Sequence, residues 1–202
     1  YLPNATWYNS VDFNNDGHIG FSEIVRRGYG GYYYGALITN QGDDHTFKRS
    51  DKGGGIYDFN RDGSVDLWRN YSNCTKVYLK NPAENNSYDE EGKVFYKSNN
   101  KVTMYGFADF NNDGYVDGYF FDPPKGQNFC NLVIVKGKPI KDWPCTQTIV
   151  VPLPMCSGYP IINMVDLDNN GFLDLFIDAT NKGYLMLMDK DFQYTITDAG
   201  FD

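Results

Sequence analysis

The sequence predicts an all-β protein built from four repeats of about 50 residues, each with a calcium-binding loop between two strands. Aromatic residues make up 17% of the chain, with 17 Tyr and 14 Phe, and such side chains are favoured in half-buried strands. A nine-residue motif recurs four times: DFNNDGHIG from Asp12, DFNRDGSVD from Asp58, DFNNDGYVD from Asp109 and DLDNNGFLD from Asp166. A repeat length of about 50 residues is typical of propeller blades or comparable small β units.

The motif has the composition of a calcium loop. Ca²⁺ prefers oxygen ligands, which a tight loop offers from side chains at positions 1, 3 and 5 and a backbone carbonyl at position 7. Position 6 is Gly in all four copies, which suits a turn with positive φ. The alternative, four unrelated Asn/Asp/Gly turns, does not explain a fixed pattern. Up to four Ca²⁺ ions are therefore expected. The predicted ligands are Asp12, Asn14, Asp16, His18 and Glu23; Asp58, Asn60, Asp62, Ser64 and Asp66; Asp109, Asn111, Asp113, Tyr115 and Asp117; and Asp166, Asp168, Asn170, Phe172 and Asp174.

The residues after the loops distinguish an EF-hand from a β-hairpin. An EF-hand requires Glu at position 12, but the last three copies have Arg69, Phe120 and Ile177 there and Asp at position 9. The segments on both sides of these loops have strand-like composition. The loops 58–66, 109–117 and 166–174 are therefore expected to join two strands.

The first loop, 12–23, follows a different pattern. Its position 9 is Gly20 and its position 12 is Glu23, which together match an EF-hand. We expect Glu23 to complete this site and one short helix to follow the loop. The alternative is a β loop like the others, in which Glu23 is an exposed strand residue.

On these motifs, the chain resembles the FG-GAP/VCBS repeats of integrin-α-like β-propellers, whose D-x-[DN]-x-[DN]-G-x-x-D loops bind Ca²⁺ between the first two strands of a blade. The resemblance implies a single domain over residues 1–202, although this family usually has seven blades and only four loops occur here. Later segments fit the remaining strands of each blade: Lys76 to Leu79, Lys93 to Tyr96, Leu132 to Val135 and Tyr184 to Leu187.

Three further segments carry structural expectations. Tyr32 to Thr39 is expected to form a strand, and Gly42 to Gly55 a polar connector. Tyr194 to Thr197 is expected to be a strand without a committed partner. It would either pair with another copy of the chain or complete the first blade of a closed four-bladed ring.

Charge and modification motifs indicate an extracellular protein. With 26 acidic and 18 basic residues the formal charge is −8, which disfavours nucleic acid, and no apolar run is long enough for membrane insertion. The even number of cysteines favours two disulfides over four free thiols, and the chain starts without Met, as after signal-peptide removal or in a fragment. The candidates are Cys74, Cys130, Cys145 and Cys156 for disulfides and Asn4, Asn70, Asn73 and Asn85 for glycosylation.

The functional expectation is a secreted structural or adhesive protein that assembles with itself or binds another extracellular protein or glycan. With two His, one of them inside a loop, no nucleophile–base arrangement is visible, so we expect no enzyme activity. The alternative is a lectin-like glycan- or protein-binding module of a larger propeller protein.

Overall fold

The computed structural model describes the backbone of residues 5–11, 20–27, 32–40 and 47–53. It describes backbone and side chains of residues 55–81, 87–99, 102–122, 130–153, 160–178 and 182–200. The described residues form antiparallel β-sheets and one short 3₁₀ helix, η1 (Ile140–Asp142). The all-β prediction is confirmed. No helix in these ranges has the length and apolar character needed to cross a membrane.

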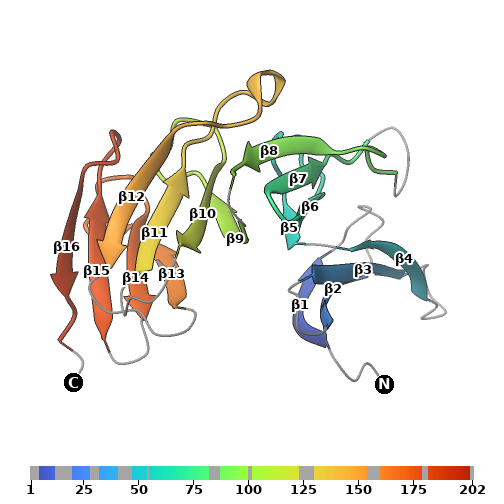
Figure 1. Ribbon diagram of the computed structural model, residues 1–202, viewed down its shortest axis with the longest axis horizontal. Helices are drawn as coiled ribbons and strands as arrows, with labels where there is room; N and C mark the ends of the chain where they lie inside the picture. The colour runs from blue at the N-terminus through green and yellow to red at the C-terminus, as the bar shows by residue number, and fades with distance from the viewer. Residues whose placement is uncertain are drawn as a thin grey trace. The chain divides into compact units, whose positions relative to one another are not determined.

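Each sheet is a meander of four consecutive antiparallel strands (Figure 1). The first contains β1 (Ala5–Val11), β2 (Gly20–Arg27), β3 (Tyr32–Asn40) and β4 (Phe47–Gly53). The second contains β5 (Gly55–Tyr57), β6 (Asp66–Asn70), β7 (Cys74–Tyr78) and β8 (Lys93–Lys97). The third contains β9 (Met104–Ala108), β10 (Asp117–Asp122), β11 (Cys130–Val135) and β12 (Thr148–Leu153). The fourth contains β13 (Ile161–Val165), β14 (Asp174–Asp178), β15 (Gly183–Met188) and β16 (Tyr194–Asp198).

Each predicted loop joins the first and second strands of its sheet. The last residue of the first strand pairs with the residue at position 9 of the motif in every sheet: Val11 with Gly20, Tyr57 with Asp66, Ala108 with Asp117 and Val165 with Asp174. A strand therefore follows each loop, as predicted for the last three.

The helix expected after the first loop is wrong. Residues Gly20–Arg27 form β2, which pairs with β1 on one side and β3 on the other, and Glu23 lies opposite Tyr8 and Ala36. Pairing on both sides gives the backbone of β2 hydrogen-bond partners that a single helical turn would leave unsatisfied. The EF-hand-like spacing of Glu23 therefore does not reflect a helix.

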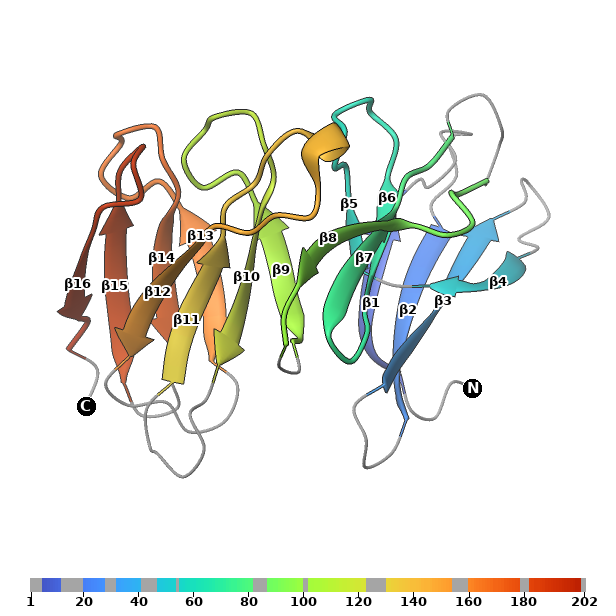
Figure 2. The same cartoon turned by 45° about the horizontal axis from the view of Figure 1, so that its top comes forward.

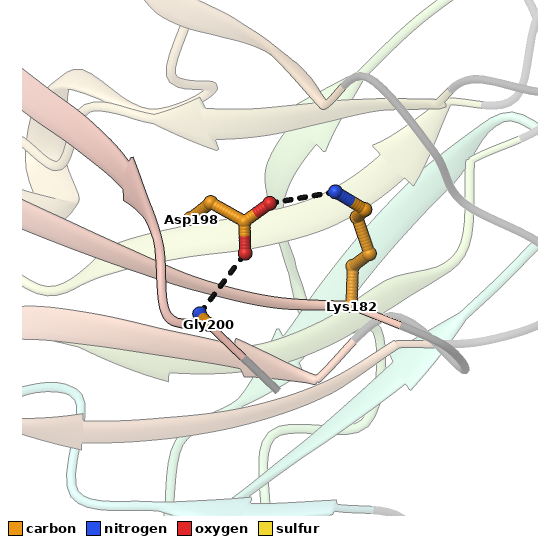
Figure 3. Close-up of polar contacts among 3 residues, drawn as sticks. All are labelled: Lys182, Asp198 and Gly200. Atoms are coloured by element: carbon orange, nitrogen blue, oxygen red, sulfur yellow. Dashed lines mark hydrogen bonds and ion pairs between the residues drawn. The ribbon is translucent and has the colours of Figure 1, made fainter. Parts of the chain in front are cut away.

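Two other expectations are corrected by strand pairing. Part of the expected polar connector, Phe47–Gly53, is the strand β4, which pairs with β3. Tyr194–Asp198 is not uncommitted, because it pairs with β15 as the outer strand of the fourth sheet. At one end of this pair Lys182 donates a 2.7 Å hydrogen bond to Asp198, which lowers the pKa of Asp198, and Gly200 donates to the other oxygen of the same carboxylate (Figure 3). Within the described residues, this strand therefore does not complete the first sheet.

The chain divides into two compact units, residues 1–103 and 104–202, with two sheets in each. In the second unit the two sheets share one apolar core, which includes Phe110 and Leu132 from one sheet and Leu175, Met186 and Phe192 from the other. In the first unit Leu67 and Tyr88 form a buried cluster against Ile56, Val65 and Tyr78. A single domain over residues 1–202 stays a prediction.

The second unit brings its loops to one end of its sheets. Figure 2 shows residues 109–116, residues 166–173 and the turn between β15 and β16 at the same end. The third and fourth loops therefore lie close together in the second unit, where Leu173 N–H donates to the Phe110 carbonyl.

Candidate calcium loops

The three described loops have the same backbone conformation. Position 4 is left-handed although it is not glycine, with φ of 57° at Arg61, 53° at Asn112 and 59° at Asn169. Position 6 is also left-handed, with φ of 83° at Gly63, 92° at Gly114 and 88° at Gly171. The positive φ predicted for the position-6 glycines is confirmed in these loops. Three sequences that share only Asp at positions 1 and 9 and Gly at position 6 thus adopt one turn geometry.

The position-1 carboxylate holds the turn closed. One of its oxygens accepts a hydrogen bond from the backbone N–H of position 5 and the other from the N–H of position 6. The same pair of bonds, between 2.9 and 3.2 Å long, forms at Asp58, Asp109 and Asp166. An Asp or Asn side chain that binds the backbone ahead of it stabilises tight turns. Position 1 therefore organises the loop and keeps its carboxylate at the loop centre.

The position-9 aspartate is fully buried and joins the loop to the third strand. Asp66, Asp117 and Asp174 each have 0% exposure. One carboxylate oxygen accepts the N–H of position 2 in its own loop, at 2.8, 3.0 and 2.7 Å respectively. The other accepts a backbone N–H at or just beyond the end of the third strand, from Lys80, Gly137 or Met188, at 2.8, 2.6 and 2.9 Å. One side chain thus fixes three segments of each sheet.

Burial disfavours the ionised form of two of these carboxylates, those of Asp66 and Asp117. Loss of water around the side chain raises the pKa of Asp66 to about 6 and that of Asp117 to about 7, even though both accept two backbone hydrogen bonds. The negative charges of the neighbouring acids at positions 1 and 5 also raise the pKa of Asp66 and Asp117. A cation among these acids would remove that repulsion.

The fourth loop gathers three acids most closely. One carboxylate oxygen from each of Asp166, Asp168 and Asp174 lies within 4.8 Å of the others. Oxygen atoms at such separations suit a single hard cation such as Ca²⁺. In the second and third loops position 3 is Asn60 and Asn111, and the described residues there do not form a comparable cluster of three acids.

The third loop contains an orphaned oxygen. Asn111 is 9% exposed, and its Oδ1 is buried without a hydrogen-bond partner. An unpaired buried amide oxygen costs free energy unless another group, such as a cation, binds it. Position 3 is a predicted ligand position, so this oxygen fits the proposed metal.

The remaining predicted ligands have varied environments. At position 7, which would offer its carbonyl, Ser64 is buried, Phe172 is half-buried and Tyr115 is exposed. Asp62, Asp113 and Asn170 at position 5 are exposed. In the first loop, Asp12, Asn14, Asp16 and His18 lie outside the described residues, while Glu23 is described only as a backbone position of β2.

The cysteines differ from the predicted two disulfides. Cys130 is disulfide-bonded, whereas Cys74 and Cys145 are free thiols; Cys156 lies outside the described residues. Cys74 begins β7 in the first unit, and Cys145 is 1% exposed in the second. Both are free thiols, so they do not form the expected second bridge with each other.

Two of the four predicted glycosylation positions are described. Asn73 is exposed in the turn between β6 and β7, whereas Asn70 ends β6 and its side-chain oxygen accepts a 2.8 Å hydrogen bond from Thr75. Asn4 and Asn85 lie outside the described residues. Glycosylation stays a prediction at all four.

No family model, curated protein or solved structure matches this chain.

Sequence reasoning missed the partners of the position-9 aspartates. Lys80, Gly137 and Met188 use only their backbone N–H groups, so their side chains share no recognisable type. The left-handed position 4 was also missed, although Asn at two of the three copies is a weak signal for that conformation.

Proposed function

We propose that this chain is a secreted, calcium-stabilised β-repeat protein of the propeller-blade type, with a structural or adhesive role in which it assembles with itself. The observation that carries the proposal is the repeated loop. Three sequence copies share one turn geometry, one pattern of carboxylate hydrogen bonds and one buried position-9 aspartate. Such repetition at equivalent places in successive sheets is expected when each loop does the same task.

Calcium binding follows from the chemistry of the loops. In each described loop, carboxylate or amide oxygens at positions 1, 3, 5 and 9 surround one turn, and hard oxygen ligands of this kind favour Ca²⁺. The like charges repel one another without a cation, and the raised pKa values of Asp66 and Asp117 reflect that cost in part. In this proposal the ion stabilises the junction between loop and strands and takes no part in catalysis.

The blade assignment rests on the meander. Each sheet has four antiparallel strands in sequence order, with the loop between the first and second. This arrangement supports the FG-GAP/VCBS resemblance, which implies sheets arranged around an axis. Blades of this kind bury their faces against neighbouring blades, and in this proposal a second copy of the chain supplies such neighbours.

Self-assembly is supported by apolar side chains left exposed on the fourth sheet. Ile161, Val165 and Leu167 are 62%, 47% and 46% exposed. Ile161 and Val165 are four residues apart on β13 and therefore share one face of the sheet, and Leu167 follows two residues after the strand ends. Exposed apolar groups gathered in this way are typical of protein contact surfaces.

Two measurements test the proposal. Thermal unfolding in Ca²⁺ and in chelator should differ, because binding only to the folded state adds about 2.7 kcal/mol per site at a hundredfold excess over Kd. An equal midpoint in both would refute calcium stabilisation. Light scattering should show a particle larger than one chain in Ca²⁺, and Val165→Ser should reduce its mass while Val150→Ser, at an exposed residue of β12, should not. A monomer at high concentration would refute assembly.

A glycan-binding role is the second candidate, and one cavity favours it. Leu67, Arg69, Tyr78, Tyr88 and Glu90 line a space of about 100 Å³ on the second sheet. Phenol, guanidinium and carboxylate groups around a small opening suit a polar ligand with hydroxyl groups. Retention of the monomeric chain on a glycan array, lost in Glu90→Gln but kept in Glu91→Gln, would favour this function over assembly.

A further inference from the structure

Asn111 connects the third loop to the neighbouring sheet. Its side-chain Nδ2 donates to Oδ2 of Asp113 at 3.0 Å within the loop and to the carbonyl of Lys190 at 3.3 Å. Lys190 belongs to the turn between β15 and β16, which is part of the fourth sheet. The other end of the amide, Oδ1, is buried and has no partner. One side chain thus reaches across two sheets and still has one unused ligand atom.

The turn at residues 189–193 is itself well organised. Asp189 Oδ1 accepts the N–H groups of Asp191 and Gln193, both at 2.9 Å, and Phe192 N–H donates to the Asp189 carbonyl at 3.0 Å. Phe192 has φ of 60° and is buried in the shared core, where the amine of Lys136 lies 4.7 Å from its ring centroid. A left-handed conformation is costly for an aromatic residue, and both the hydrogen bonds to Asp189 and the burial of Phe192 in the shared core offset that cost.

A second contact joins the two loops of this unit directly. The backbone N–H of Leu173 in the fourth loop donates to the carbonyl of Phe110 in the third loop at 3.0 Å. Phe110 follows Asp109 in the chain, and Leu173 precedes Asp174. The two candidate sites are therefore linked through one peptide hydrogen bond.

We propose that calcium bound in the third loop locks the 189–193 turn onto the third sheet through Asn111. This inference rests on the calcium binding proposed above. A cation among Asp109, Asp113 and Asp117 attracts the orphaned Oδ1 and repels the Nδ2 group. It therefore excludes the flipped amide, in which Oδ1 would face the Lys190 carbonyl and that hydrogen bond would be lost. In this proposal the third site stabilises the contact between the third and fourth sheets as well as the loop in which the ion is bound. We call this contact, from Asn111 to the carbonyl of Lys190, the joint.

The second loop provides a matched control. Asn60 also occupies position 3 and its Nδ2 donates to Asp62 at 2.8 Å, which is the same contact that Asn111 makes with Asp113. Asn60 is exposed, however, and its side-chain hydrogen bonds are made to Asp62 within its own loop. In the fourth loop, position 3 is Asp168, which has no amide donor.

Hydrogen exchange measured by mass spectrometry on the full chain tests the joint. Amides 113–115 report on the third loop and amides 191–193 on the turn, each with and without Ca²⁺. In the wild type Ca²⁺ should slow both sets, the turn by up to about tenfold, because the bound ion excludes the flipped amide that lacks the hydrogen bond to Lys190. In Asn111→Asp the oxygen ligand is kept but the donor to Lys190 is lost, so Ca²⁺ should still slow the loop and no longer slow the turn. Asn60→Asp should behave as the wild type at both sets.

The outcomes separate this inference from the proposed function. If Ca²⁺ slows the wild-type loop but not the turn, or if the turn stays protected in Asn111→Asp, the joint is refuted while calcium binding stands. The joint is also refuted if Ca²⁺ no longer slows hydrogen exchange of the turn amides in Asn60→Asp. If Ca²⁺ leaves the wild-type loop unchanged, calcium binding at this loop is refuted and the joint with it. Circular dichroism checks that Asn111→Asp folds, and Asn111→Ser, whose short side chain cannot reach Lys190, repeats the test.

Discussion

The backbone N–H of Gly137 donates a 2.6 Å hydrogen bond to Oδ1 of Asp117, which starts β10. The other oxygen of Asp117 accepts the N–H of Phe110. A fully buried carboxylate thus ties the loop to the residue just past β11. The equivalent aspartates of the second and fourth sheets make the same pair of bonds, so removing either carboxylate should leave the same backbone N–H groups without an acceptor.

Asp117→Asn should lower the free energy of unfolding in Ca²⁺ by about 1–3 kcal/mol, because one buried N–H loses its acceptor. Asp113→Asn, at an exposed position of the same loop, should weaken calcium binding with little effect on the metal-free fold. Urea denaturation in Ca²⁺ and in chelator measures both variants. Equal effects of the two changes in chelator would contradict a distinct structural role for Asp117.

The metal-free chain should be less stable at pH 8 than at pH 5. The pKa of Asp66 is raised to about 6 and that of Asp117 to about 7, against about 3.9 in an unfolded chain. Between roughly pH 4 and 7 the folded state therefore binds more protons, and the free energy of unfolding falls as the pH rises through this window. Melting temperatures in chelator measure the trend, and Asp117→Asn should reduce it. A metal-free chain that melts higher at pH 8 would contradict this expectation.

Calcium should reverse this pH dependence, because the ion binds the ionised carboxylates and competes with their protons. The gain in melting temperature on adding Ca²⁺ should therefore be larger at pH 8 than at pH 5. Calcium titrations followed by thermal unfolding at both pH values measure it. A gain independent of pH would mean that the buried aspartates do not contribute to binding.

Two glycines should be sensitive to substitution for different reasons. Gly63→Ala adds a Cβ that meets no atom within 4 Å, but the φ of 83° disfavours any L side chain by about 1–2 kcal/mol. At Gly137 an added Cβ would collide with the backbone carbonyl of Val116, so Gly137→Ala should cost more than Gly63→Ala. Chemical denaturation of both variants measures the order, and the reverse order would contradict the close approach at Gly137.

In thiol labelling without reductant, Cys74 should react faster than Cys145. Cys74 is half-buried, whereas Cys145 is 1% exposed and burial raises its pKa to about 12. Because the thiolate is the reactive form, Cys145 should react only after unfolding. Mass spectrometry of the labelled chain checks this, and a chain with no free thiol in denaturant would restore the two disulfides expected from the cysteine count.

Local patterns in the sequence predicted much of the fold. The composition around Leu67, Phe120 and Ile177 predicted strands after the loops, and Gly63, Gly114 and Gly171 predicted the left-handed turns that the structure contains. These signals are local, since strand alternation and turn preferences act over a few residues. Glu23 shows the limit of such reasoning, because a spacing typical of an EF-hand lies in a strand that pairs on both sides.

By itself, the sequence determined the all-β class, the four copies of the loop motif and which oxygen-bearing residues those copies contain. Only the tertiary structure decided that the position-9 aspartates reach Lys80, Gly137 and Met188, and that Asn111 reaches Lys190. It also placed Tyr194–Asp198 beside β15. The physical reason is that these contacts use backbone N–H and C=O groups far apart along the chain. Every residue type except proline offers the same pair of groups, so no side-chain pattern specifies which of them will meet.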